Sequence, residues 1–409
     1  AHKIILEMML PAISNDLIEL LLNRELKSAE SDRDKVQVVE LLDTTSGNTE
    51  QIFAPFYVDA TDLGDLLPLI NAEYVVGSES INDTQEPHAK GNSSNPDNVQ
   101  AFTWPIGVGY DENNLDIIEK PQHYNFWRDF TPKLNPPWNG KLLDWKRPRG
   151  TNNKQIDTVL FSHEASSEND VNSIFNLRQV ISKYNHPSGT FSFDVTTLNC
   201  SQNDFFLGNI IDKPEKVKND LLFQAKQLSL SFLYWLQTEA PRPNGGFGYP
   251  GLFIFSDFLG SNDGFSLIPY TRESRRIKSV STVTERHVSR ELSTPNNKTN
   301  FKDSVGLGFH KIDLHPTTGG DNYLILETVP YQIPLGCLIP ERIENMLPAC
   351  KNIGTTHITN GCYRLHHVEW NIGESVGSLI GYCLLNNLKP QQVLKSQKIL
   401  NDFQSLILK

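Results

Sequence analysis

The chain has 409 residues, of which 38% are hydrophobic and 21% are charged, and its formal net charge at pH 7 is −11. This length allows one large or two moderate domains, and the composition is typical of a soluble globular protein. The acidic balance argues against general nucleic-acid binding, which needs a basic face. No apolar run approaches the roughly 20 residues that cross a bilayer. We therefore expect a soluble protein, cytoplasmic because no signal or transmembrane segment is seen, and the pattern carries no signal for its oligomeric state.

The cysteines predict neither a disulfide framework nor a metal site. There are five, an odd number, and none belongs to a C-x-x-C pair. Most of them lie in the apolar C-terminal region, where buried free thiols are the usual state.

The first elements are expected to be a helix and two strands. Ile4–Leu26 has the apolar periodicity of a helix interrupted at Pro11, and Lys35–Leu42 and Gln51–Val58 read as strands. Because the chain starts at Ala1, without Met and directly inside the helical pattern, we expect a fragment or a protein from which a segment has been removed.

The second strand runs directly into the sequence DATDLGDLL, Asp59–Leu67. A strand that ends here and leads into a helix could form a ligand-binding edge, since crevices in α/β sheets lie at the carboxyl ends of strands. The alternative is a helix N-terminus at which acidic residues cap the backbone. Both interpretations stay open from these residues alone.

The composition changes after about residue 81, and an aromatic-rich segment follows up to residue 270. We expect one long helix here, opened by Pro214 and running to Leu236. Gly246–Gly251 fits G-x-G-x-x-G letter for letter, but a dinucleotide fingerprint must follow a strand and open a helix. Here a helix precedes it and the strand-like Leu252–Phe255 follows, so we predict a turn.

Two groups of polar residues are candidates for chemistry. Arg272, Arg275 and Arg276 could clamp an anion, because guanidinium groups match carboxylates in a bidentate way; the alternative is a structural salt-bridge cluster. His315 is the best candidate for proton transfer, and Asp313 could orient its ring; a structural role is the alternative for a lone histidine, and His366 and His367 are weaker candidates for proton transfer.

The C-terminal stretch combines a short apolar strand, Met346–Cys350, with a loop and a long helix. Glycines recur every fourth residue of that helix, at Gly373, Gly377 and Gly381, and therefore lie on one face. Such a face suggests the close approach of a backbone or a flat ligand; tight helix packing is the alternative. We expect the helix to begin at Trp370–Gly373, where free N–H groups would favour a partly anionic ligand.

Together these patterns resemble the FAD-dependent oxidoreductases with a glutathione-reductase-like flavin domain. The resemblance covers most of the chain and departs from the family at Asp62, where many relatives carry Gly. It rests on Asp59–Leu67, Pro269–Arg276, Asp303–Gly306, Asp313–His315, Asn345–Ala349, Gly361–Arg364 and Asn371–Gly377.

The resemblance implies an α/β fold with an incomplete, Rossmann-like two-dinucleotide-binding flavin domain. Residues 1–80 and 271–409 would form that domain, and residues 81–270 an inserted α+β substrate domain. The implied cofactor is FAD, and the implied reaction is hydride transfer between a small anionic substrate and flavin N5. The implied catalytic residues are His315, Arg272 and Arg275. The implied cofactor contacts are Ala60, Thr61, Asp65, Gly361, Arg364, Asn371, Ile372 and Gly373.

One expected feature of this family is missing from the sequence. A flavoprotein of this type opens with a strand, a G-x-G-x-x-G turn and a helix, and nothing of the kind precedes residue 60. We therefore expect a truncated flavoenzyme that binds FAD weakly or not at all. The alternative from another class is a non-catalytic binding or scaffold protein that has lost the cofactor. A hydrolase is disfavoured, because no nucleophile elbow is present.

Overall fold

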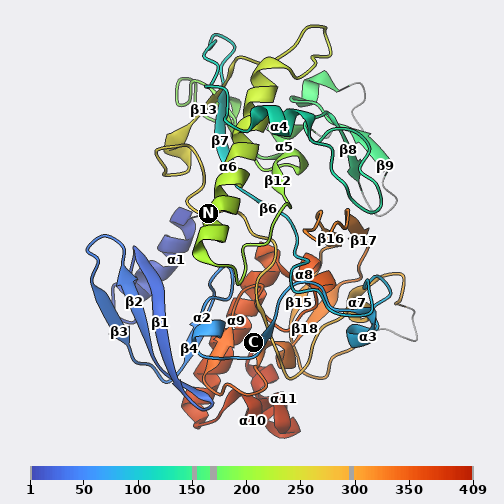
Figure 1. Ribbon diagram of the computed structural model, residues 1–409. Coiled ribbons are helices and arrows are strands. Elements are labelled where there is room, and N and C mark those ends of the chain that lie inside the picture. Colours follow the sequence, from blue (N-terminus) through green and yellow to red (C-terminus); the bar gives the residue numbers. More distant parts are fainter. Residues whose placement is uncertain (1, 150–153, 166–172, 294–298, 408–409) are drawn as a thin grey trace.

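Figure 1 shows the computed structural model, which describes residues 2–149, 154–165, 173–293 and 299–407. The helices are α1 (His2–Ile13), α2 (Leu66–Leu69), α3 (Ile81–Thr84), α4 (Tyr124–Asp129), α5 (Ile174–Leu177), α6 (Glu215–Thr238), α7 (Glu285–Val288), α8 (His357–Tyr363), α9 (His366–Asn386), α10 (Pro390–Lys395) and α11 (Gln397–Ile407). Short 3₁₀ helices are η1 (Ser162–Glu164), η2 (Lys183–Asn185), η3 (Ser201–Asn203), η4 (Ser256–Phe258) and η5 (Leu335–Leu338).

Most strands pair in small antiparallel sheets. Their orders are β1-β2-β3, β10-β11-β7-β13, β12-β6, β14-β5, β15-β18, β16-β17 and β8-β9, whereas β4 and β19 pair in parallel. The strands are β1 (Arg24–Asp32), β2 (Lys35–Asp43), β3 (Thr49–Ile52), β4 (Tyr57–Asp59), β5 (Tyr74–Val75), β6 (Phe102–Thr103), β7 (Ile106–Tyr110), β8 (Lys146–Arg149), β9 (Lys154–Asp157), β10 (Gln179–Ile181), β11 (Asp194–Leu198), β12 (Asp204–Phe205), β13 (Leu252–Ile254), β14 (Arg276–Ile277), β15 (Ser304–Gly308), β16 (Ile312–Leu314), β17 (Leu324–Leu326), β18 (Tyr331–Pro334) and β19 (Met346–Pro348).

The N-terminal helix is shorter than the periodicity predicted. It ends at Ile13, and β1 begins at Arg24 and pairs along β2. Asp16 and Asn23 both have left-handed φ angles, at 56° and 55°, which a continuing helix cannot accommodate. The prediction of a helix to Leu26 was therefore wrong, because the antiparallel pairing with β2 overrides the local pattern.

The expected strand over residues 51–58 is divided in two. Its first part is β3, which pairs with β2, and its second part is β4, which pairs in parallel with β19. Pro55 lies between them and has no backbone N–H to donate to a sheet. The division places Asp59 at the end of a parallel strand, beside the end of β19.

The upper part of Figure 1 is built around α6. Pro214 is the N-cap of this helix, as predicted, and the helix buries Ala225, Leu228, Phe232 and Leu236 completely. Aromatic side chains from α4, β6, β12 and the following loops complete this core. The expected strand after residue 251 is also present, as β13.

The C-terminal part forms a second large core from α8, α9, α11 and the strands β15, β16 and β18. In Figure 1 the hairpin β16–β17 lies at the border with the upper part, below β8 and β9. A smaller core joins β2 and α2 to Ile277, Ile343 and Met346. No helix among the described residues is long and apolar enough to cross a membrane.

Helices and strands are therefore mixed, as an α/β fold requires. The Rossmann-like arrangement stays a prediction, because β4–β19 is the sole parallel pair among the described strands. The division at residues 80 and 270 also stays a prediction. All five cysteines are free thiols, as the spacing predicted.

Candidate active site

The carboxyl ends of β4 and β19 lie side by side, because the two strands pair in parallel. At the end of β4, the buried Asp59 carboxylate accepts hydrogen bonds from the Thr61 N–H at 2.9 Å, the Thr61 hydroxyl at 2.7 Å and the Leu66 N–H at 3.3 Å. Burial raises the pKa of Asp59, although these hydrogen bonds oppose the shift. Asp59 thus connects the end of β4 to the first turn of α2, which favours the interpretation that acidic residues cap the backbone here.

The predicted cofactor residues at this edge differ in their availability. Ala60 is exposed, whereas the Thr61 hydroxyl accepts the Asp65 N–H at 2.6 Å. Asp65 forms an ion pair with Arg275 at 3.0 Å. Thr61 and Asp65 therefore already have partners within the protein.

Asp62, where many relatives of the resembled family carry Gly, has both carboxylate oxygens engaged. One oxygen pairs with the Lys351 ammonium, from the loop after β19, and the other accepts the Thr271 hydroxyl. Lys351 is itself buried. The Asp62 side chain thus connects the ends of β4 and β19 to the segment that contains Thr271.

Gly361 and Arg364 lie on a buried helix and not in the expected loop. Gly361 is inside α8, and a Cβ there would approach the Leu314 side chain at 2.8 Å and the Asp313 N atom at 3.1 Å, so glycine lets α8 pack directly on β16. Arg364 caps α8 and donates to the Tyr270 hydroxyl at 3.0 Å and the Asp313 carbonyl at 2.9 Å. Its Nε has no partner among the described residues.

The helix α9 begins at His366, so the expected start at Trp370–Gly373 was wrong. The N–H groups of Asn371, Ile372 and Gly373 lie in the second turn and are used within the helix. Asn371 donates its amide to the His367 carbonyl at 3.3 Å, and the Ile372 side chain is fully buried in the C-terminal core. The sequence missed this because nothing marks Leu365 as an N-cap.

Arg272 is almost completely buried, at 3% exposure. It forms an ion pair with Asp204 at 3.0 Å and donates to the Ala101 carbonyl at 2.9 Å and the Thr103 hydroxyl at 3.0 Å. The guanidinium carbon also lies 5.0 Å from the centre of the Tyr270 ring. Its Nε is without a partner among the described residues.

Arg275 points to a different place from Arg272. It pairs with Asp212 at 2.9 Å and with Asp65, and it does not line the cavity that Arg272 lines. Burial acts to lower the pKa of Arg275, but the two carboxylates outweigh it and raise the pKa. The salt-bridge interpretation of the arginine cluster therefore describes Arg275 well.

His315 is held by a carboxylate that the sequence did not suggest. Its Nδ1 lies 2.6 Å from Asp204 Oδ2, whereas its Nε2 is 4.0 Å from the expected partner Asp313. The ring of Tyr323 packs beside it, with centroids 5.2 Å apart. Burial and the charge of Arg272 lower the pKa of His315, although both carboxylates oppose this. The expectation that Asp313 orients the ring was wrong; Asp204 does so.

Asp204 is completely buried at the start of β12. Burial alone would raise its pKa, but Arg272 and His315 hold it well below the usual value, and the Thr103 hydroxyl donates to it at 2.6 Å. The carboxylate is therefore ionised and can hold the Nδ1–H of a neutral His315. In that tautomer Nε2 carries the lone pair and can accept a proton.

Arg272, Asp313 and His315 line a cavity of about 250 Å³. It lies between β8 and α5 of the upper part and the β16–β17 hairpin (Figure 1). Its other polar walls include Arg147, Arg149, Arg178, Gln202, Lys311 and Tyr323.

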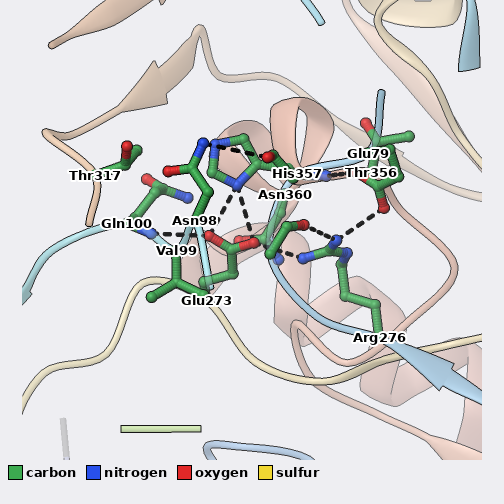
Figure 2. Close-up of polar contacts among 12 residues, drawn as sticks. Glu79, Asn98, Val99, Gln100, Glu273, Arg276, Thr317, Thr356, His357 and Asn360 are labelled. Atoms are coloured by element: carbon green, nitrogen blue, oxygen red, sulfur yellow. Dashed lines mark hydrogen bonds and ion pairs between the residues drawn. The ribbon is translucent and has the colours of Figure 1, made fainter. Parts of the chain in front are cut away.

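Figure 2 shows a second buried network of polar contacts, centred on Glu273 and His357. The Glu273 carboxylate accepts the Gln100 N–H at 3.0 Å and Arg276 at 2.6 Å, and both of its oxygens lie 3.0 Å from His357 Nδ1. The Glu79 carboxylate forms an ion pair with Arg276 at 2.8 Å and accepts a hydrogen bond from the His357 N–H at 2.8 Å. Burial would raise the pKa of Glu273, but His357 and Arg276 lower it to about 2. This network fastens three distant segments together.

Three residues named in the sequence analysis line this cavity, namely Arg272, Asp313 and His315; their catalytic roles stay predictions. The sequence analysis missed the lining residues Tyr323, Arg147 and Arg178 and the buried Asp204, which come from segments that no motif marks. The basic run over residues 146–149 was a visible signal, but nothing local indicated that it faces His315.

Two features of the fold fit the flavin half of FAD. The Arg364 Nε is a buried donor without a partner among the described residues, and the α9 face at Gly373, Gly377 and Gly381 is open, since a Cβ there would meet nothing within 4 Å. The described part of the chain contains no comparable binding site for the phosphate groups of FAD. Gly246–Gly251, the one G-x-G-x-x-G of the sequence, is a turn that leads into β13, as predicted.

Comparison with known proteins gives one match. The family model described as "FAD dependent oxidoreductase" matches residues 1–406, nearly the whole chain. No curated protein and no solved structure matches.

Proposed function

Because the chain belongs to the FAD dependent oxidoreductase family, whose cofactor is FAD, we propose that it transfers a hydride between a small anionic substrate and the flavin. The cavity beside His315 is the proposed substrate site. One observation carries this proposal: His315 and the buried Arg272 line the same cavity, and both are held by the Asp204 carboxylate.

His315 is the proposed proton-transfer group. When the substrate is oxidised, His315 Nε2 would accept the proton that the substrate loses, while bound FAD would take up its two electrons as a hydride. Asp204 orients the ring and stabilises the imidazolium that forms. Because the pKa of His315 is lowered, the ring is neutral at pH 7 and ready to accept the proton.

Bound FAD would supply the two-electron chemistry, and the chain would supply position, charge and a route for the proton. We propose Arg364 and Gly373 as cofactor contacts, because one offers a free buried donor and the other an open backbone. Ala60 and Asn371 are exposed or half-buried and stay proposed contacts. Thr61, Asp65, Gly361 and Ile372 have packing or hydrogen-bonding roles that leave them less available.

The test is His315→Gln in protein loaded with FAD. Anaerobic bleaching of the flavin absorbance by a donor that reduces the wild type should slow by about 10²-fold or more, the usual contribution of a general base. The FAD content should not change. His367→Gln, on the exposed start of α9, is the matched control and should bleach at the wild-type rate. Equal rates for His315→Gln and the control would remove His315 from the mechanism.

A binding protein without redox activity is the second candidate. It is favoured by one observation, that the described residues contain no phosphate seat of the G-x-G-x-x-G type. Stoichiometric FAD in the purified chain would exclude this candidate.

A further inference from the structure

Among the described residues, the cavity beside His315 is lined by more positive than negative side chains. Arg147, Arg149, Arg178 and Lys311 line it, and none of them forms an ion pair with another described residue. Asp313 is the one carboxylate among the described lining residues. In a chain with a net charge of −11, such a concentration of cations indicates an anionic ligand.

The cations occupy two facing walls. Arg147 is in β8 and Arg178 follows α5, so both belong to the upper part. Lys311 directly precedes β16 of the β16–β17 hairpin. Side chains two residues apart in a strand share a face, so Lys311 lies on the same face as Asp313 and His315, and all three line the cavity. A ligand between the walls would meet positive charge at both ends.

Two buried polar atoms at this cavity also lack a partner among the described residues. They are the Nε of Arg272 and the Oε1 of Gln202, whose side chains are 3% and 1% exposed. Gln202 uses its other amide atom to donate to the Asp144 carbonyl at 3.1 Å. Buried polar groups normally have partners. The Arg272 Nε–H is a donor that an anion can satisfy, whereas the Gln202 Oε1 is an acceptor that needs a hydroxyl, an amide or a water.

The two arginines of the upper wall line the same cavity as Cys200. Burial raises the pKa of the Cys200 thiol to about 11, and the charges of Arg147 and Arg178 both oppose this shift. Guanidinium groups bind carboxylates in a bidentate way, whereas a lysine binds as a point charge.

We propose that this cavity binds a small dicarboxylate. One carboxylate lies between Arg147 and Arg178, and the other lies at the lower wall with Lys311 and the free Nε of Arg272, next to His315. The volume of about 250 Å³ restricts the ligand to a compact molecule. The identification of this ligand as the redox substrate rests on the proposed function; the binding itself does not.

The experiment is calorimetric titration of the full chain with three probes: succinate, butyrate and inorganic phosphate. Succinate and butyrate share a four-carbon skeleton and differ by one carboxylate. We expect succinate to bind at least about tenfold more tightly than butyrate, because only succinate engages both walls. The double variant Arg147→Gln/Arg178→Gln should weaken succinate binding by a similar factor and leave butyrate binding nearly unchanged. Lys216→Gln, at an exposed position of α6, is the control for a lost charge.

Three results would overturn the proposal: equal affinity for succinate and butyrate, unchanged succinate binding in the double variant, or phosphate binding as tight as that of succinate. The circular dichroism of each variant identifies loss of folding, and single variants at Arg147 and Arg178 replace the double variant in that case. Because the titration needs neither FAD nor turnover, its failure is distinct from that of the proposed function, which fails when His315→Gln leaves flavin reduction unchanged.

Discussion

Replacing Asp204 with Asn should destabilise the protein more strongly than most single substitutions. The carboxylate is completely buried and compensates the charge of Arg272, which is 3% exposed. The variant keeps the shape of the side chain but leaves the guanidinium buried without a counter-charge. Removing one partner of such a pair costs roughly 3–5 kcal/mol. We expect a loss of that size in the unfolding free energy, measured by urea titration with tryptophan fluorescence.

Asp212→Asn is the matched control, because it removes a carboxylate that also pairs with an arginine of the same segment. Asp212 is 42% exposed, so water screens its pair with Arg275 and the loss should be about 0–1 kcal/mol. Similar losses for the two variants would refute the argument that burial makes the Asp204 pair different.

The same pair predicts a pH dependence. The folded pKa of Asp204 lies well below the ordinary value of 3.8, so its stabilising contribution is present above pH 3.8 and is lost as the pH falls toward the folded pKa. The stability difference between wild type and Asp204→Asn should therefore shrink in strong acid. A difference that stays constant there would contradict the depressed pKa.

Three further variants test other parts of the structure. Burial acts to lower the pKa of His357, but Glu273 outweighs it and raises the pKa above 6.5. The stability lost in His357→Gln should therefore be greatest below pH 6.5 and should shrink as the pH rises through the folded pKa. Urea titrations at several pH values measure this loss. Gly377→Ala should raise the thermal stability by up to about 1 kcal/mol, because the position is open; a decrease would show that this face is covered. Gly77→Ala should cost about 1–3 kcal/mol in urea titration, because φ is +71° and a Cβ would lie 2.7 Å from the Pro96 carbonyl carbon; a neutral effect would contradict that geometry.

The sequence predicted those elements whose cause is local. The long helix α6 follows from its apolar face and from the fixed φ of Pro214 at its N-cap. The turn at Gly246–Gly251 follows from what flanks it. The N-terminal helix was overextended because the chain turns at Asp16 and Asn23 and then pairs with β2 from Arg24 onward, and that pairing leaves no local mark.

The candidate site was predictable only in part, for the same reason. His315 and Arg272 were identified through family motifs, yet the residue that joins them is Asp204, 111 residues before His315. Neither periodicity nor spacing connects residues so far apart. The glycine row of α9 was recognised, but its expected close partner is not present among the described residues, since the face is open.

Asp204 joins residues that lie far apart in the sequence. The carboxylate is supplied by β12, and its partners Arg272 and His315 come from the segment after residue 270 and from the end of β16. Without those partners, Asp204 would be a buried charge with no compensation; without Asp204, His315 would lose its orientation and Arg272 its counter-charge. Arg147 and Arg178, on the upper wall of the cavity, also precede residue 270. In the proposed function, substrate recognition and proton transfer therefore both depend on the contact between the segments before and after residue 270, and a change that shifts one segment against the other should disturb both together.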